Sequence, residues 1–126
     1  MKYHITKSEL EILGVLWKAE RPLSRADILE LSSDKTWKDN SIHILLNGML
    51  KKRVIKEDGF ARSGKVWGRL YAPAITVEEY YADQFQATAK PDLVMLFDAI
   101  LKQSADRDTV EKLQIMLDEA KANLTD

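Results

Sequence analysis

The hydrophobic and polar positions along the first third of the chain repeat with a helical period. Thr6-Lys7-Ser8-Glu9 is a T-x-x-E sequence, in which the threonine and glutamate side chains accept hydrogen bonds from each other's backbone amides and start a helix. The apolar residues from Leu10 to Trp17 form a wide face, so we expect this helix to be packed on more than one side. After an extended break at Pro22, Ser24 and Asp27 predict the start of a second, short helix.

A third helix is predicted over Asp39–Lys52. Its apolar residues fall at spacings of three and four and form a single stripe that we expect in the core, namely Ile42, Leu45, Leu46, Met49 and Leu50. Gly48 lies on the opposite side of this helix, where a glycine costs about 1 kcal/mol relative to alanine. This glycine indicates either the close approach of another group or neutral drift.

A β-hairpin is predicted directly after the third helix. Two β-prone runs, Val54–Ala61 and Val66–Tyr71, flank the segment Arg62-Ser63-Gly64-Lys65, which has a Ser-Gly tip with a basic residue on either side. Three helices followed by a hairpin is the order of a winged helix-turn-helix domain, in which the hairpin is the wing. We therefore expect a mainly α fold with a small β-hairpin.

The rest of the chain predicts further helices. We place the domain boundary at Pro73, between a winged-helix domain over residues 1–73 and a helical domain over residues 74–126. A second T-x-x-E sequence at Thr76 starts a helix that runs to about Ala89, Pro91 fits the first position of a fifth helix, and Asp106 caps a sixth.

The last two predicted helices carry more apolar surface than they can bury on each other. Because an exposed apolar seam implies a partner, we expect a two-fold dimer contact through this domain. The expected contact residues are Leu93, Leu96, Phe97, Ile100, Val110, Leu113, Leu117, Ala120 and Leu124. The alternative is that this segment folds back onto the first domain.

Charge divides the chain in the same way as the predicted domains. The formal net charge of the 126 residues is −1, but residues 1–73 sum to +5 and residues 74–126 to −6. A basic first domain favours a polyanionic partner, whereas chance clustering of solvated charges is the alternative. The chain has no cysteine, no apolar signal-peptide core and no membrane-length apolar run, so we expect a soluble, cytoplasmic protein without direct membrane insertion.

The polar side of Asp39–Lys52 has side chains that suit DNA. Amide side chains pair with adenine, hydroxyl and imidazole groups reach base edges or phosphates, and an isoleucine can meet a thymine methyl group. The expected base-contacting residues are Asn40, Ser41, His43, Ile44 and Asn47. The expected backbone-contacting residues are Ser24, Arg25, Lys38, Lys51, Lys52, Arg62 and Lys65. The alternative is an amphipathic helix with a solvated polar side.

The sequence has no pattern typical of an enzyme. It lacks a glycine-rich phosphate loop and the G-x-S-x-G and H-E-x-x-H motifs, and its two histidines, His4 and His43, have no ligand-spaced neighbours. We therefore expect no catalytic residue, no metal and no cofactor.

The chain resembles the penicillinase-repressor (BlaI/MecI/CopY-type) family. Residues 5–13 with Leu16-Trp17 are similar to the family's first helix, and Trp37 followed by residues 41–52 is similar to its recognition helix. The resemblance covers nearly the whole chain and is most specific in the first 55 residues. It implies a homodimeric repressor at a dyad-symmetric operator in double-stranded DNA.

The resemblance also implies a mode of induction. In the family, a membrane sensor-protease system commonly relieves repression by causing cleavage of the tail at an Asn-Phe step. The matching step here is Leu96-Phe97, which lacks the asparagine. The cysteine cluster of copper-responsive members is absent, and His43 and Gly48 stand where the family is often basic.

Two other functions compete with the repressor. One is a winged-helix protein-interaction module that does not bind DNA, and the other is a small enzyme, which would require a pocket with converging polar groups.

Overall fold

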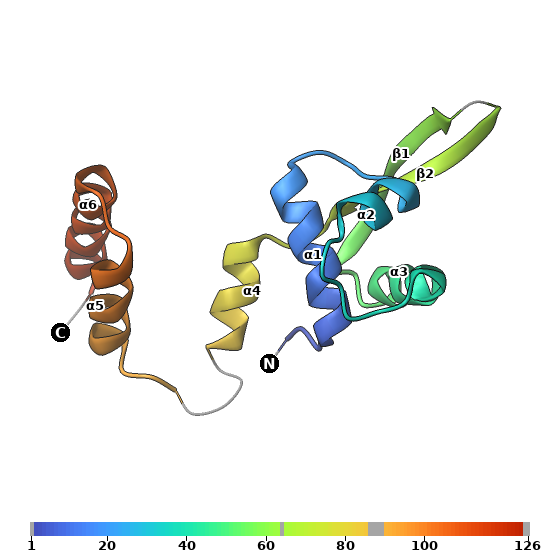
Figure 1. Cartoon of the computed structure of the whole chain (residues 1–126). Coiled ribbons are helices and arrows are strands. Elements are labelled where there is room, and N and C mark those ends of the chain that lie inside the picture. Colours follow the sequence, from blue (N-terminus) through green and yellow to red (C-terminus); the bar gives the residue numbers. More distant parts are fainter. Residues whose placement is uncertain (1, 64, 86–89, 125–126) are drawn as a thin grey trace. The chain divides into compact units, whose positions relative to one another are not determined.

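A computed structural model describes residues 2–63, 65–85 and 90–124 (Figure 1). In chain order the elements are α1 (Lys7–Ala19), α2 (Arg25–Leu31), the 3₁₀ turn η1 (Asp39–Ser41), α3 (Ile42–Lys51), β1 (Ile55–Ser63), β2 (Val66–Pro73), α4 (Val77–Gln84), α5 (Leu93–Gln103) and α6 (Arg107–Asn123). The chain forms two compact units, Met1–Thr88 and Ala89–Asp126, which we call the head and the tail.

The helices of the head begin at the predicted caps. The Thr6 hydroxyl accepts from the Glu9 amide while the Glu9 carboxylate accepts from the Thr6 amide. Reciprocal pairs of the same kind join Ser24 with Asp27 and Thr76 with Glu79. Each pair satisfies backbone amides that a helix leaves free at its start, so the local sequence determines where α1, α2 and α4 begin.

The core of the head lies where α1, α2 and α3 meet the hairpin. The predicted stripe of α3 faces inward, with Ile42, Leu46 and Met49 buried and Leu45 and Leu50 packed against them. Burying a side chain of this kind stabilises a fold by about 1.5–3 kcal/mol. The stripe therefore directs the other side of α3 toward solvent. The predicted helix over Asp39–Lys52 is in fact the turn η1 followed by α3.

The hairpin is antiparallel and bulged. Glu57 pairs with Tyr71 and Phe60 with Arg69, so β1 has one more residue than β2 in this interval. Gly59 lies within the bulge and adopts a φ of 91°, which side chains disfavour. Leu23 adds a short bridge on the other side of β2. Its amide donates to the Tyr71 carbonyl at 2.9 Å, and the Tyr71 amide donates to the Leu23 carbonyl at 2.8 Å.

The head extends past the boundary that we predicted at Pro73. Ile75 and Tyr80 are buried in the head core, and the Trp17 indole donates to the Ile75 carbonyl at 2.9 Å. The Asp83 carboxylate accepts from the backbone amides of Lys2 and Tyr3 at 2.6 and 2.9 Å. Because of these contacts α4 belongs to the head, and the compact units divide after Thr88.

The tail consists of α5 and α6, and neither helix has a buried residue. Asp106 caps α6 as predicted, but α5 begins at Leu93 with Asp92 as its cap, so Pro91 precedes the helix instead of opening it. The carboxylate of Asp92 satisfies the Met95 amide at 3.0 Å, a bond that proline cannot supply. The predicted extension of α4 to Ala89 lies outside the described residues.

None of the helices in the described part of the chain is long and apolar enough to span a membrane.

Candidate nucleic-acid interface

A cleft of about 750 Å³ lies between α2, α3 and the hairpin. Five residues that we predicted to contact DNA line it together, namely Ser24, Arg25, His43, Asn47 and Arg62. They come from three elements that are distant in sequence. The fold thus gathers the first turn of α2, the polar side of α3 and the wing around one opening.

The Leu23–Tyr71 bridge holds the start of α2 beside the wing. The following residue, Ser24, caps α2 through its hydroxyl oxygen, so its hydroxyl proton is free to be donated. The Ser24 amide donates to the Asp27 carboxylate and lowers the pKa of Asp27, which keeps this side chain ionised in its capping role. The first turn of α2 is therefore ordered before any ligand binds.

Arg25 and His43 connect α2 with α3 inside the cleft. The Arg25 guanidinium contacts the imidazole ring of His43, and both side chains are exposed. A guanidinium can only donate, so the ring nitrogen that it meets acts as an acceptor. This contact joins a predicted phosphate-contacting residue to a predicted base-contacting residue.

The other DNA-contacting residues that we predicted in α3, in η1 and just before η1 do not line the cleft. Ile44 is 77% exposed, which is high for an apolar side chain and leaves its methyl groups available to a partner. Lys38, Asn40 and Lys51 are exposed, and Ser41 is half-buried. They continue the polar side of η1 and α3 that begins in the cleft with His43 and Asn47.

The wing contributes two residues that we did not predict from the sequence. Trp67 and Arg69 line the cleft, and Trp67 is 64% exposed. Trp67 stands opposite Arg62 across the two strands, and Arg69 pairs with Glu57 at 2.9 Å. Alternation along β2 puts Trp67 and Arg69 on one side of the hairpin, which is the signal that would have found them. Lys65 is exposed but lies outside the cleft.

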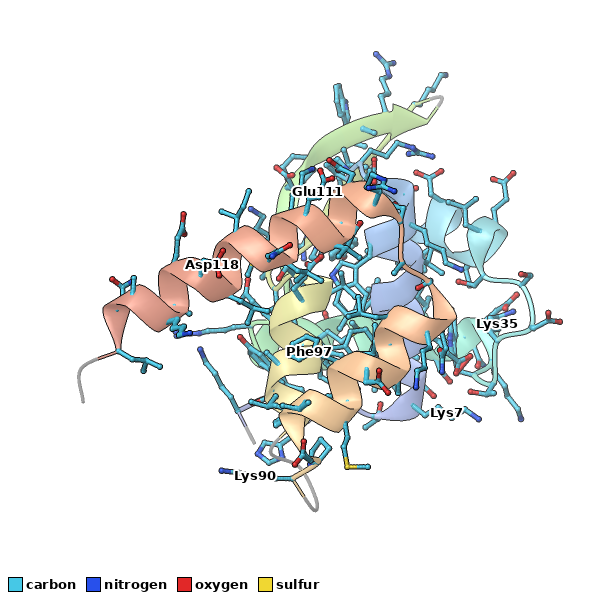
Figure 2. All side chains as sticks on the ribbon, turned by 90° about the vertical axis from the view of Figure 1, so that its left-hand side faces the viewer. Lys7, Lys35, Lys90, Phe97, Glu111 and Asp118 are labelled. Carbon is cyan, nitrogen blue, oxygen red and sulfur yellow. The ribbon has the colours of Figure 1, made fainter. Side chains whose placement is uncertain are left out.

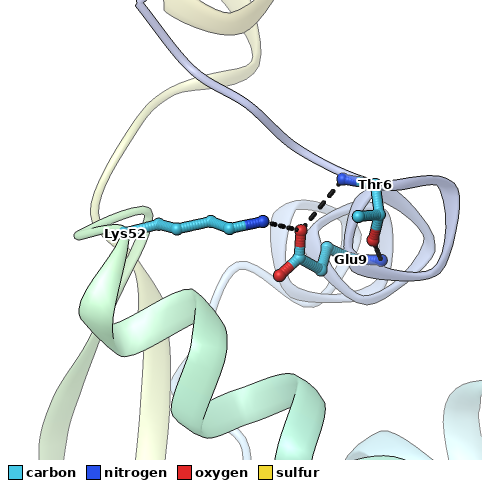
Figure 3. A network of polar contacts seen from close by, with 3 residues as sticks. All are labelled: Thr6, Glu9 and Lys52. Atoms are coloured by element: carbon cyan, nitrogen blue, oxygen red, sulfur yellow. Dashed lines mark hydrogen bonds and ion pairs between the residues drawn. The ribbon is translucent and has the colours of Figure 1, made fainter.

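Lys52, which we predicted to contact the DNA backbone, has a partner within the protein. Its ammonium forms an ion pair with Glu9 at 2.5 Å (Figure 3). Gly48 also faces Glu9, because a Cβ built on Gly48 would lie 3.6 Å from the Glu9 Oε2 atom. These two residues of the third helix therefore contact α1. Among the described residues, no group of three or more acidic or histidine side chains is placed to hold a metal ion.

The chain belongs to the penicillinase repressor family, whose model matches residues 5–119. It is thus a transcriptional regulator of the repressor type with a winged-helix fold. A comparison with curated proteins finds no match.

The solved structures that are similar to this chain include the following two. One is Bacillus subtilis PadR in complex with operator DNA, at 20% identity and a TM-score of 0.48, covering 90% of this chain and 70% of PadR. The other is a mutant of MepR from a multidrug-resistant S. aureus clinical isolate, at 16% identity and a TM-score of 0.48, covering 96% of this chain and 80% of MepR.

Proposed function

We propose that this protein is a homodimeric repressor that binds a dyad-symmetric operator, with α3 in the major groove and the wing on the adjacent backbone. The observation that carries the proposal is the cleft, where Arg25, Asn47 and Arg62 converge from three elements. A helix beside a hairpin suits a DNA strand, because the phosphates can meet the arginine side chains while the base edges meet α3.

The cleft residues have separate roles in this proposal. Asn47 reads a base edge, Ile44 meets a thymine methyl group, and Ser24 and Arg25 hold a phosphate at the start of α2. Trp67 packs its exposed ring on the sugar-phosphate strand beside Arg62. Lys38, Asn40, Ser41, His43, Lys51, Lys65 and Arg69 complete the interface.

The tail supports the dimer. Apolar side chains of α5 and α6 remain exposed, including Phe97 at 47% and Leu117 at 66%. Figure 2 shows Phe97 on α5, and Glu111 and Asp118 along α6. Since Glu111 and Asp118 are seven residues apart, they share one side of α6 and leave the other side to its apolar residues. We propose that a second copy of the tail covers these residues, so that the dimer presents two heads to two half-sites.

We further propose that cleavage of the tail relieves repression. Leu96-Phe97, the step matched to the family's cleavage site, lies in the first turns of α5. Cutting there would separate the head and the start of α5 from α6, and with it from part of the dimer contact. Incubation with a membrane sensor-protease of the host tests this part, and an uncut tail would contradict it.

Selection of bound duplexes from a random pool tests the DNA-binding proposal. We expect a dyad with half-sites about one helical turn apart. On the selected duplex, Asn47→Ala should lose about 1–3 kcal/mol at one base pair and relax specificity there, whereas Lys65→Ala should weaken all duplexes alike and flatten the salt slope by about 0.9. A protein with no salt-dependent duplex binding would overturn the proposal and favour a protein-interaction module.

A further inference from the structure

Glu9 is a charged side chain in an unusual place. It is only 4% exposed. Among the residues that the structure describes, it is the one polar or charged residue that is buried. An isolated buried carboxylate is costly, so a fold keeps one only when the charge is paired and hydrogen-bonded. The contacts of Glu9 therefore indicate what it does.

Glu9 joins the start of α1 to the end of α3. Its Oε1 atom accepts from the Thr6 amide at 2.9 Å and from the Lys52 ammonium at 2.5 Å (Figure 3). Lys52 is the C-terminal cap of α3, and its own amide donates to the carbonyl of Gly48 at 3.0 Å. Both charges also suit their helices, since an anion favours an N-terminus and a cation a C-terminus.

Gly48 leaves room for this pair. One turn before Lys52, it faces the Oε2 atom of Glu9, and an added Cβ would lie 3.6 Å from that atom, which is an ordinary contact distance. An alanine would fit at this position, whereas a side chain longer than alanine would extend toward the carboxylate. The smallest residue of α3 therefore lies where the helix approaches the buried charge.

We propose that Glu9 is a positioning residue for DNA reading, which holds Lys52 and so fixes the end of α3 on α1. The inference rests on the proposed function. In this role Lys52 contacts no phosphate, whereas the preceding residue, Lys51, contacts one in the proposed function. Loss of the pair lets the end of α3 shift, so that the side chains in the major groove no longer meet their bases together.

Lys51 provides a matched comparison. It has the same side chain as its neighbour and is exposed, and within the described residues it has no ion pair. Adjacent residues on a helix point in directions that differ by about 100°, so one lysine faces Glu9 and the other faces away. The same substitution should therefore change the salt dependence of DNA binding at Lys51, but the stability and the affinity at Lys52.

The experiment compares Lys51→Met, Lys52→Met and Lys52→Arg in the full chain, on the selected duplex and at a temperature where every variant is folded. Lys51→Met should flatten the salt slope by about 0.9 and leave the Tm unchanged. Lys52→Met should keep the slope, weaken binding several-fold and lower the Tm by on the order of 10 °C. Lys52→Arg should restore both binding and Tm, because it keeps the ion pair.

A double-mutant cycle with Glu9→Gln keeps the inference testable if Lys52→Met does not fold. The double variant leaves no unpaired charge, so its Tm should fall by less than the sum of the single changes, while its binding stays weakened. A flattened salt slope in either Lys52 variant, binding equal to the parent in the double variant, or additive Tm changes would overturn the inference. A parent protein that binds no duplex would instead overturn the proposed function, and the inference with it.

Discussion

The head and the tail contain apolar side chains of the same kinds, but only the head buries them. In the head, helices and strands from distant parts of the sequence enclose Leu16, Ile28 and Leu46. In the tail, α5 and α6 have no buried residue. Burial is the main favourable contribution to folding, so we expect the head to fold by itself, whereas in the proposed function the tail gains its burial from a second copy.

The largest effect is expected where the head ends. A fragment of residues 1–88 should be more stable than one of residues 1–73 by about 3–6 kcal/mol, because the shorter fragment loses the burial of Ile75 and Tyr80, each contributing about 1.5–3 kcal/mol. Urea denaturation of both fragments measures the difference. Equal stabilities would return the boundary to Pro73.

The tail is tested by a charge in its apolar surface. Phe97→Asp should weaken dimerisation by about 2–3 kcal/mol, roughly a hundredfold, since it removes an aromatic contact and buries a charge. Sedimentation over a range of concentrations measures this. Asp118→Asn, on the polar side of α6, is the matched control and should leave association unchanged. A parent protein that is monomeric throughout would contradict the dimer.

A smaller effect is expected in acid. Burial raises the pKa of Glu9, but the hydrogen bonds from Lys52 and Thr6 and the Lys52 charge together bring this pKa below its ordinary value of 4.5. A lowered native pKa adds stability above the unfolded-state pKa, and this stability is lost as the pH falls through the native pKa. Urea denaturation at several pH values should show that the free energy of unfolding falls less steeply in acid for Glu9→Gln than for the parent.

Glu20→Gln is the control for that measurement, since it removes the same charge from an exposed residue of the same segment. If both variants change the acid dependence equally, the effect belongs to net charge and not to the pair.

The smallest effect is expected at Gly48. An alanine Cβ would meet the Glu9 carboxylate at 3.6 Å, an ordinary contact distance, so Gly48→Ala should raise stability by up to about 1 kcal/mol through helix propensity. Thermal unfolding followed by circular dichroism measures the change. A lower Tm would mean that the carboxylate tolerates no methyl group, and that Gly48 is required for close approach.

Patterns that span a few residues predicted much of the head. A capping pair joins residues three apart, so Thr6 with Glu9 and Ser24 with Asp27 determine helix starts locally. The stripe through Ile42 and Met49 follows from helical period alone, and it also predicted which side of α3 is exposed. These are the features that the sequence could supply without knowledge of the tertiary fold.

The wing was harder to predict in detail. The extra residue at Gly59 shifts the pairing between β1 and β2, so the face on which each later side chain lies depends on the bulge. Trp67 and Arg69 share one side of β2 by simple alternation, but only the packing of the hairpin beside α2 and α3 shows that this side faces the cleft. Leu23 was missed as a bridge residue because its partner, Tyr71, is distant in sequence.

The sequence by itself determined the helix starts, the inward side of α3, the presence of the hairpin and the apolar surface of the tail, because each depends on residues within a few positions of one another. Only the tertiary structure decided that α4 joins the head, that three elements meet around one cleft, and that Lys52 forms an ion pair with Glu9 while Lys51 forms none in the described part of the chain. Those outcomes depend on contacts between residues dozens of positions apart, which no local pattern records.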